Sequence, residues 1–127
     1  MPVLGVGGIF FRAQDPDALS AWYLEHLGVG AGQAVEGTGE ADEWSWNTQG
    51  GPLIFAPFPA DTDYWATDKQ TMLNLRVSDL DGLLEQLAAS GVTAIVKPEL
   101  DSPEVGRFAR IHDPEGNAIE LWEPAAD

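Results

Sequence analysis

Residues 9–28, IFFRAQDPDALSAWYLEHLG, return in altered form at residues 73–91, LNLRVSDLDGLLEQLAASG. Each copy has an alternating apolar run, an aspartate suited to cap a helix, apolar residues at helical spacing and a glycine suited to end the helix. The sequence therefore predicts a duplicated strand-helix unit. A shift of 64 residues superposes Ile9, Phe11, Arg12, Asp15, Asp17 and Leu19 on Leu73, Leu75, Arg76, Asp79, Asp81 and Leu83.

More strands are predicted around these units, because β-branched and aromatic runs alternate with Gly and Pro turns. Each half then reads as βαβββ, with module 1 at about residues 3–58 and module 2 at about residues 70–124 of a single domain, 1–127. We expect an α+β fold in which the paired modules form one curved mixed β-sheet, with helices on its convex face and the concave face open. Three of the four strands of the first module can be placed in the sequence, at 3–12, 43–47 and 52–58, and all four of the second, at 72–77, 93–97, 107–112 and 118–123.

Composition disfavours several classes of binding partner and excludes sites that need cysteine. With 21 acidic against 6 basic residues, the net charge of −15 disfavours binding to nucleic acid and to anionic membranes. The absence of cysteine excludes disulfides, thiolate nucleophiles and thiolate metal sites. Because no apolar run approaches the roughly 20 residues of a membrane span and no basic leader precedes the first strand, we expect a cytoplasmic protein.

Strand alternation assigns side chains to the open face. Leu73, Leu75 and Val77 are uniformly apolar and must meet a helix, so their neighbours along the strand face the concave side. The repeat carries this assignment to the first strand, and the apolar pair Ile119 and Leu121 carries it to the last. The predicted concave set is Gly8, Phe10, Arg12, Met72, Asn74, Arg76, Glu120 and Trp122.

Arginines on this face predict an anion site. Arg12 and Arg76 occupy equivalent places, and Arg110, which alternates with Phe108, is a third candidate. Guanidinium groups bind carboxylate or phosphate in bidentate fashion. The alternative is that each arginine pairs with a nearby acid such as Asp15 or Asp79.

Aromatic residues suggest a stacking surface for a planar ligand. Trp44 and Trp46 share one face of a predicted strand, and together with Phe10, Phe108 and Trp122 they are candidate ligand contacts. The alternative for these aromatics is ordinary core packing.

Residues 10–28 and the closing segment 113–124, DPEGNAIELWEP, resemble the vicinal oxygen chelate superfamily, which contains glyoxalase I, bleomycin-resistance proteins and extradiol dioxygenases. The resemblance covers nearly the whole chain. It implies paired βαβββ modules, a homodimer, and a divalent metal or a ligand in the concavity. In glyoxalase I-like members, an arginine at the position of Arg12 contacts the anionic end of the glutathione conjugate.

The resemblance also implies a ligand set for the metal. Metal-dependent members place His, Gln or Glu at four positions, but a divalent cation needs at least three such ligands. The single carboxylate found here predicts no metal and no other cofactor, with a divalent metal as the alternative. His26 and His112 lie outside the ligand positions and are interpreted as structural. The four matching positions are Gly8, Ile54 (or Ala56, if that strand slips by two), Met72 and Glu120.

Glu120 is the candidate catalytic residue, as a base that moves a proton next to a carbonyl. Its alternative role is an ion pair with Arg12, Arg76 or Arg110. The leading hypothesis is a metal-independent protein that binds a small anionic or aromatic molecule. The rivals are a glyoxalase-like lyase or isomerase with a degenerate or inter-subunit site, and a structural or protein-binding module whose concavity is filled.

Overall fold

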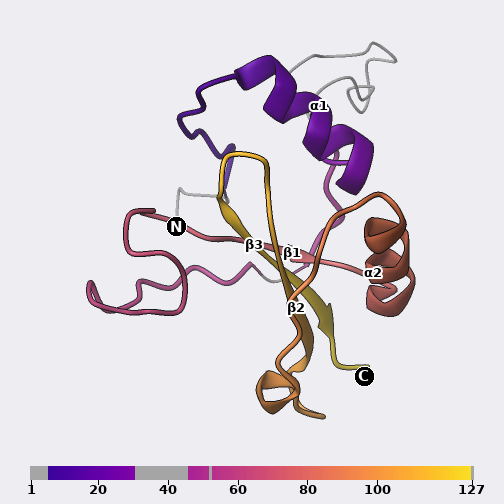
Figure 1. Ribbon diagram of the computed structural model, residues 1–127. Helices are drawn as coiled ribbons and strands as arrows, with labels where there is room; N and C mark the ends of the chain where they lie inside the picture. The colour runs from indigo at the N-terminus through magenta and orange to yellow at the C-terminus, as the bar shows by residue number, and fades with distance from the viewer. Residues whose placement is uncertain (1–5, 31–45, 52, 127) are drawn as a thin grey trace.

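The computed structural model describes residues 6–30, 46–51 and 53–126. The three strands found there form one mixed sheet of order β1-β3-β2, in which β3 runs parallel to β1 and antiparallel to β2. Figure 1 shows α1 and α2 beside this central sheet. The α+β class is confirmed. The elements are α1 (Pro16–Leu27), β1 (Leu73–Arg76), α2 (Leu80–Ala89), the 3-10 helix η1 (Pro98–Leu100), β2 (Gly106–His112) and β3 (Ala118–Pro124).

Both helices begin at the predicted aspartates. An Asp15 side-chain oxygen accepts a hydrogen bond from the Ala18 N–H at 3.1 Å, and an Asp79 oxygen accepts one from the Gly82 N–H, also at 3.1 Å. Helix α1 ends at Gly28, whose φ of 67° lies in the left-handed region that glycine tolerates best. The predicted aspartate caps are confirmed at both helix starts.

The hydrophobic core lies between the sheet and the helices. Ile111, Ile119 and Leu121 are completely buried, and Leu80 and Leu87 of α2 pack against them. Alternate residues of β3 therefore face the helices, as the sequence pattern predicts. None of the helices within the described ranges is long and apolar enough to cross a membrane.

The first half departs from its prediction. Residues 6–14, 46–51 and 53–58 carry no strand, although strands are predicted at 3–12, 43–47 and 52–58. Most of their apolar side chains are exposed, with Phe10 at 91% and Phe55 at 88%. A strand persists only when its N–H and C=O groups pair with a neighbour, and no ladder joins these described segments to one another. The paired, curved sheet stays a prediction.

The strand predicted at 93–97 is also wrong in extent. It is reduced to one antiparallel bridge, in which Ile95 and Arg110 exchange two backbone hydrogen bonds of 2.8 Å. The chain then enters η1 at Pro98, which has no N–H to donate to a ladder. Beyond this bridge β2 is one edge of the sheet formed by the described residues.

The turn at residues 113–117 fastens α1 to the sheet. Asp113 is buried and accepts hydrogen bonds from the Tyr23 hydroxyl at 2.8 Å and from the Asn117 N–H at 3.0 Å. The neighbouring Glu115 carboxylate accepts the Gln14 N–H at 2.7 Å. Burial, followed by the hydrogen bond and negative charge of Asp113, raises the pKa of Tyr23. The predicted turn thus links the two halves of the chain.

Candidate functional site

The sheet face turned away from the core carries the predicted polar residues in two rows. Cross-strand register places Glu120 between Asn74 of β1 and Arg110 of β2. The next row places Trp122 between Arg76 and Phe108. The structure therefore brings together five of the predicted ligand-binding residues around Glu120.

Glu120 is buried, with 8% of its surface exposed. One carboxylate oxygen accepts a hydrogen bond from the Tyr64 hydroxyl, and the other accepts one from the Asn74 side-chain amide at 2.8 Å. No ion pair links Glu120 to an arginine of the described chain, so the predicted ion pair is wrong there. Two neutral donors satisfy this carboxylate instead.

Arg110 lies over the ring of Tyr64, with its guanidinium carbon 4.9 Å from the ring centre. The Arg110 Nε is buried and has no hydrogen-bond partner among the residues placed by the structure. A buried donor without an acceptor costs about 1–3 kcal/mol, so this atom is suited to a ligand oxygen. Burial, aided by the hydrogen bond and charge of Glu120, raises the pKa of Tyr64 to about 12, and Arg110 opposes that rise.

Aromatic side chains extend the face next to this cluster. Phe108 and Trp122 stack with their ring centres 6.2 Å apart and their planes 9° from parallel. The Trp122 indole N–H donates to the Val105 carbonyl at 2.9 Å, which fixes the orientation of its ring. These two rings give the site a flat apolar surface.

The two other predicted arginines have different surroundings. Arg76 donates to the backbone carbonyls of Gln49 at 2.9 Å and Gly50 at 3.5 Å. Arg12 is exposed and forms no ion pair within the described ranges. The alternative pairing with Asp15 and Asp79 is wrong for these described residues, because no ion pair joins them; both aspartates cap helices instead. An anion site shared by Arg12 and Arg76 stays a prediction.

The other described candidates take no part in the hydrogen bonds around Glu120. Phe10 is 91% exposed and Trp46 is 37% exposed, and Trp44 lies outside the described residues. His26 packs against Trp22 with ring centres 5.1 Å apart, in keeping with a structural role. His112 is exposed at the end of β2.

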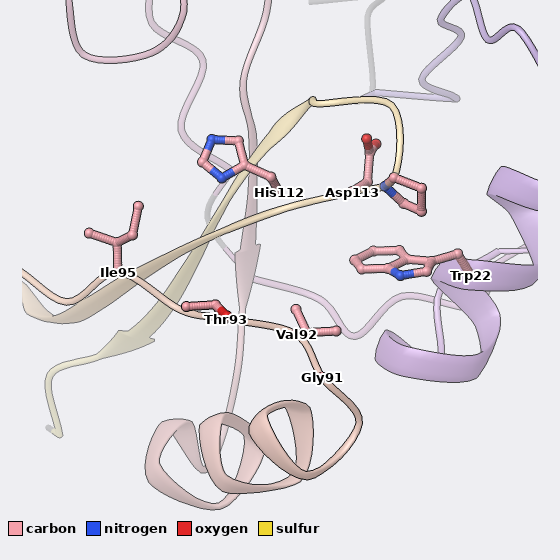
Figure 2. Close-up of a pocket in the computed structure, with 8 residues that line it drawn as sticks. Trp22, Gly91, Val92, Thr93, Ile95, His112 and Asp113 are labelled. Carbon is pink, nitrogen blue, oxygen red and sulfur yellow. The ribbon is translucent and has the colours of Figure 1, made fainter.

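A surface hollow of about 410 Å³ lies at that end of β2 (Figure 2). In Figure 2 the His112 imidazole points away from the Trp22 indole, and the Asp113 carboxylate is already held by Tyr23. The hollow therefore gathers few free polar groups, and the Glu120 face is the better candidate site. Its lining residues are Trp22, Gly91, Val92, Thr93, Ile95, His112, Asp113 and Pro114.

The donor set does not fit a resident divalent metal. Gly8, Ile54 and Met72 supply no nitrogen or oxygen side-chain ligand, and both Glu120 oxygens already accept hydrogen bonds. A stable divalent site needs at least three such ligands. No group of three His, Asp or Glu side chains suited to a metal occurs among residues 6–30, 46–51 and 53–126.

Tyr64 is the site residue that sequence reasoning missed. It belongs to the predicted connection at residues 59–69, which has no strand periodicity to aim its side chain. Two adjacent aromatics, Tyr64 and Trp65, in an otherwise polar connection are the signal that points to a packed segment.

Comparisons with known proteins agree with this fold. TnmS3, an antibiotic binding protein from Streptomyces sp. CB03234, superposes with a TM-score of 0.60 at 22% identity, over 98% of this chain and 99% of TnmS3. A glyoxalase/bleomycin resistance protein from the same organism gives a TM-score of 0.43 at 22% identity, over 87% of this chain and 92% of that protein. No curated protein matches the chain. The glyoxalase-like domain family matches residues 8–122. Because that match spans most of the sequence, the chain belongs to the glyoxalase-like domain family, within the vicinal oxygen chelate superfamily.

Proposed function

We propose that this chain binds a small anionic or aromatic organic molecule on the sheet face around Glu120, without a resident metal. The observation that carries the proposal is the unpartnered, buried Nε of Arg110 beside the stacked Phe108 and Trp122 rings. A positively charged donor next to a flat apolar surface suits a planar molecule that bears an oxygen acceptor.

Chemistry at the site favours binding over metal-assisted catalysis. A glyoxalase-type reaction needs a Lewis acid or a free base, and the Glu120 carboxylate is engaged by Tyr64 and Asn74. TnmS3, which shares the fold, is an antibiotic binding protein, and the proposal extends that kind of activity to this chain. Fold alone does not fix function, so the proposal rests on the site.

The test is a titration with benzoate, which combines an aromatic ring with an anionic acceptor, followed by amide NMR shifts. We expect benzoate to shift the resonances of Phe108, Arg110 and Trp122. Arg110→Gln should weaken binding about tenfold, because it removes a charged hydrogen bond. Arg107→Gln is the matched control, because Arg107 pairs with Asp81, away from this face.

Equal affinity in the two variants, or no binding at all, would contradict the proposed site. Metal independence has its own test in elemental analysis of protein purified without chelators. Stoichiometric metal, together with nickel-, cobalt- or zinc-dependent turnover of a ketoaldehyde conjugate, would establish the glyoxalase-like alternative.

A homodimer is part of the same proposal. The exposed apolar side chains of Phe10, Ile54 and Phe55 support it, because a partner subunit would remove this apolar surface from water. Sedimentation velocity should give twice the monomer mass of 13.7 kDa for the wild type. Phe55→Asp should shift the protein toward the monomer, and a purely monomeric wild type would contradict the dimer.

A further inference from the structure

We propose that Tyr64 stands in for the ligand, and that the natural ligand is a hydroxyaryl compound: a planar aromatic ring that carries a phenolic hydroxyl. This inference rests on the proposed function, since it names the class of molecule bound on the same face.

The surroundings of Tyr64 are those that a free phenol would require. Its hydroxyl donates to the buried Glu120 carboxylate, and the guanidinium of Arg110 lies over its ring at 4.9 Å. Phe58 stacks on the ring, with centres 5.7 Å apart and planes 25° from parallel. One group thus contacts the hydroxyl and two others contact the ring, which is how a binding site selects one kind of molecule.

Tyr64 reaches this place from a connecting segment. Local turns hold residues 59–69, in which the Thr62 N–H donates to the Pro59 carbonyl at 3.0 Å and the Lys69 N–H donates to the Ala66 carbonyl at 3.1 Å. No ladder hydrogen bond of the described sheet involves Tyr64. Its side chain can therefore leave the site without breaking the sheet, in the way that binding loops generally move on a fixed scaffold.

Once Tyr64 has left, the groups without hydrogen-bond partners determine which ligand can bind in its place. Without Tyr64, one oxygen of Glu120 loses its donor, while Asn74 still holds the other. Arg110, directly across from Glu120 in the sheet register, still lacks an acceptor for its Nε. A phenolic hydroxyl would donate to the free Glu120 oxygen, and an oxygen acceptor on the same ring system would accept from the Arg110 Nε. A site built to hydrogen-bond a hydroxyl discriminates strongly against analogues that lack it.

The test uses p-cresol, which reproduces the tyrosine side chain, against the Tyr64→Ala variant. Two matched probes, 4-methylanisole and toluene, keep the ring but have no hydroxyl proton to donate. By NMR titration we expect p-cresol to bind Tyr64→Ala at least about tenfold more tightly than either control probe, as the loss of a hydrogen bond to a charged group predicts. Wild type should bind p-cresol more weakly than Tyr64→Ala, because its own phenol competes.

Tyr64→Phe provides the second variant in case alanine disturbs the segment. It keeps the ring but loses the hydrogen bond to Glu120, so p-cresol should bind it more tightly than it binds wild type. Equal binding of p-cresol and 4-methylanisole, or no difference among the three proteins, would overturn the stand-in role. If benzoate binding still depends on Arg110 in that case, the proposed function survives alone; if neither probe binds this face, both proposals fail.

Discussion

The two halves of the chain repeat one sequence pattern but differ in how they bury it. Leu53 and Phe55 of the first half are 60% and 88% exposed. Their counterparts 66 positions later, Ile119 and Leu121, are completely buried in β3. The residue types are alike, so the difference comes from the neighbours that β1 and β2 supply to β3. An alternating apolar pattern predicts which face of a strand is buried, but the burial itself depends on neighbouring strands that the pattern does not identify.

The helices teach the opposite lesson. Asp15 and Asp79 cap α1 and α2 with the same geometry, because a cap uses only atoms within one turn of the helix. Local interactions thus repeat in both halves, whereas the sheet ladder is described only in the second. We expect this contrast between the halves to appear in the stabilities of matched variants, most strongly in the core.

Truncation of matched core positions should separate the halves most clearly. Leu121→Ala removes a fully buried side chain and should lower the free energy of unfolding by about 2–5 kcal/mol. At a concentration low enough to keep the protein monomeric, Phe55→Ala removes an exposed ring and should change it by no more than about 0.5 kcal/mol. Urea denaturation of both variants measures the difference. A comparable cost for Phe55→Ala would show that a paired first module covers Phe55 in solution.

Loss of the hydrogen bonds that link the two halves should cause the next largest fall in the free energy of unfolding. Asp113→Ala leaves the Tyr23 hydroxyl and the donors of Asn117 without their acceptor, and should destabilise the protein by about 2–3 kcal/mol. Tyr23→Phe breaks one of these bonds and should cost about 1 kcal/mol. Chemical denaturation gives both values. If Asp113→Ala were neutral, α1 would not be fastened to the sheet through this turn.

Removal of the two helix caps tests whether α1 and α2 unfold together. Asp15→Ala and Asp79→Ala should each cost about 1 kcal/mol, since each removes one side-chain acceptor from a helix start. Equal costs in global unfolding indicate one cooperative unit. A cost for Asp79→Ala alone would mean that α1 opens independently, and amide hydrogen exchange along α1 would then be fast in the wild type.

The same contrast explains what the sequence could predict. Helix starts, the turn at 113–117 and the face that carries Asn74, Glu120 and Trp122 follow from spacing and alternation alone. The hydrogen bond between Tyr64 and Glu120 cannot be predicted in this way, because Tyr64 lies 56 residues away in a segment without periodicity. Contacts made across the fold by an irregular segment leave no periodic trace in the sequence.

The smallest expected effect concerns one exposed charge in each half. Asp81 receives two hydrogen bonds from Arg107, which lower the pKa of Asp81 below its ordinary value of 3.8. Its repeat mate Asp17 occupies the same place in the first turn of α1 and forms no ion pair with another described residue. Asp17→Asn therefore controls for the helix dipole, and Asp81→Asn should be the more destabilising of the two at neutral pH.

The pH dependence follows from the lowered pKa of Asp81. The ion pair contributes stability above the pKa of Asp81 in the unfolded chain, and that contribution is lost as the pH falls through its pKa in the folded protein. The difference between the variants should consequently shrink below about pH 3.8 and should also fall with added salt. A difference that persisted in acid would have to come from packing, because Asp81 would by then be protonated in both the folded and the unfolded chain.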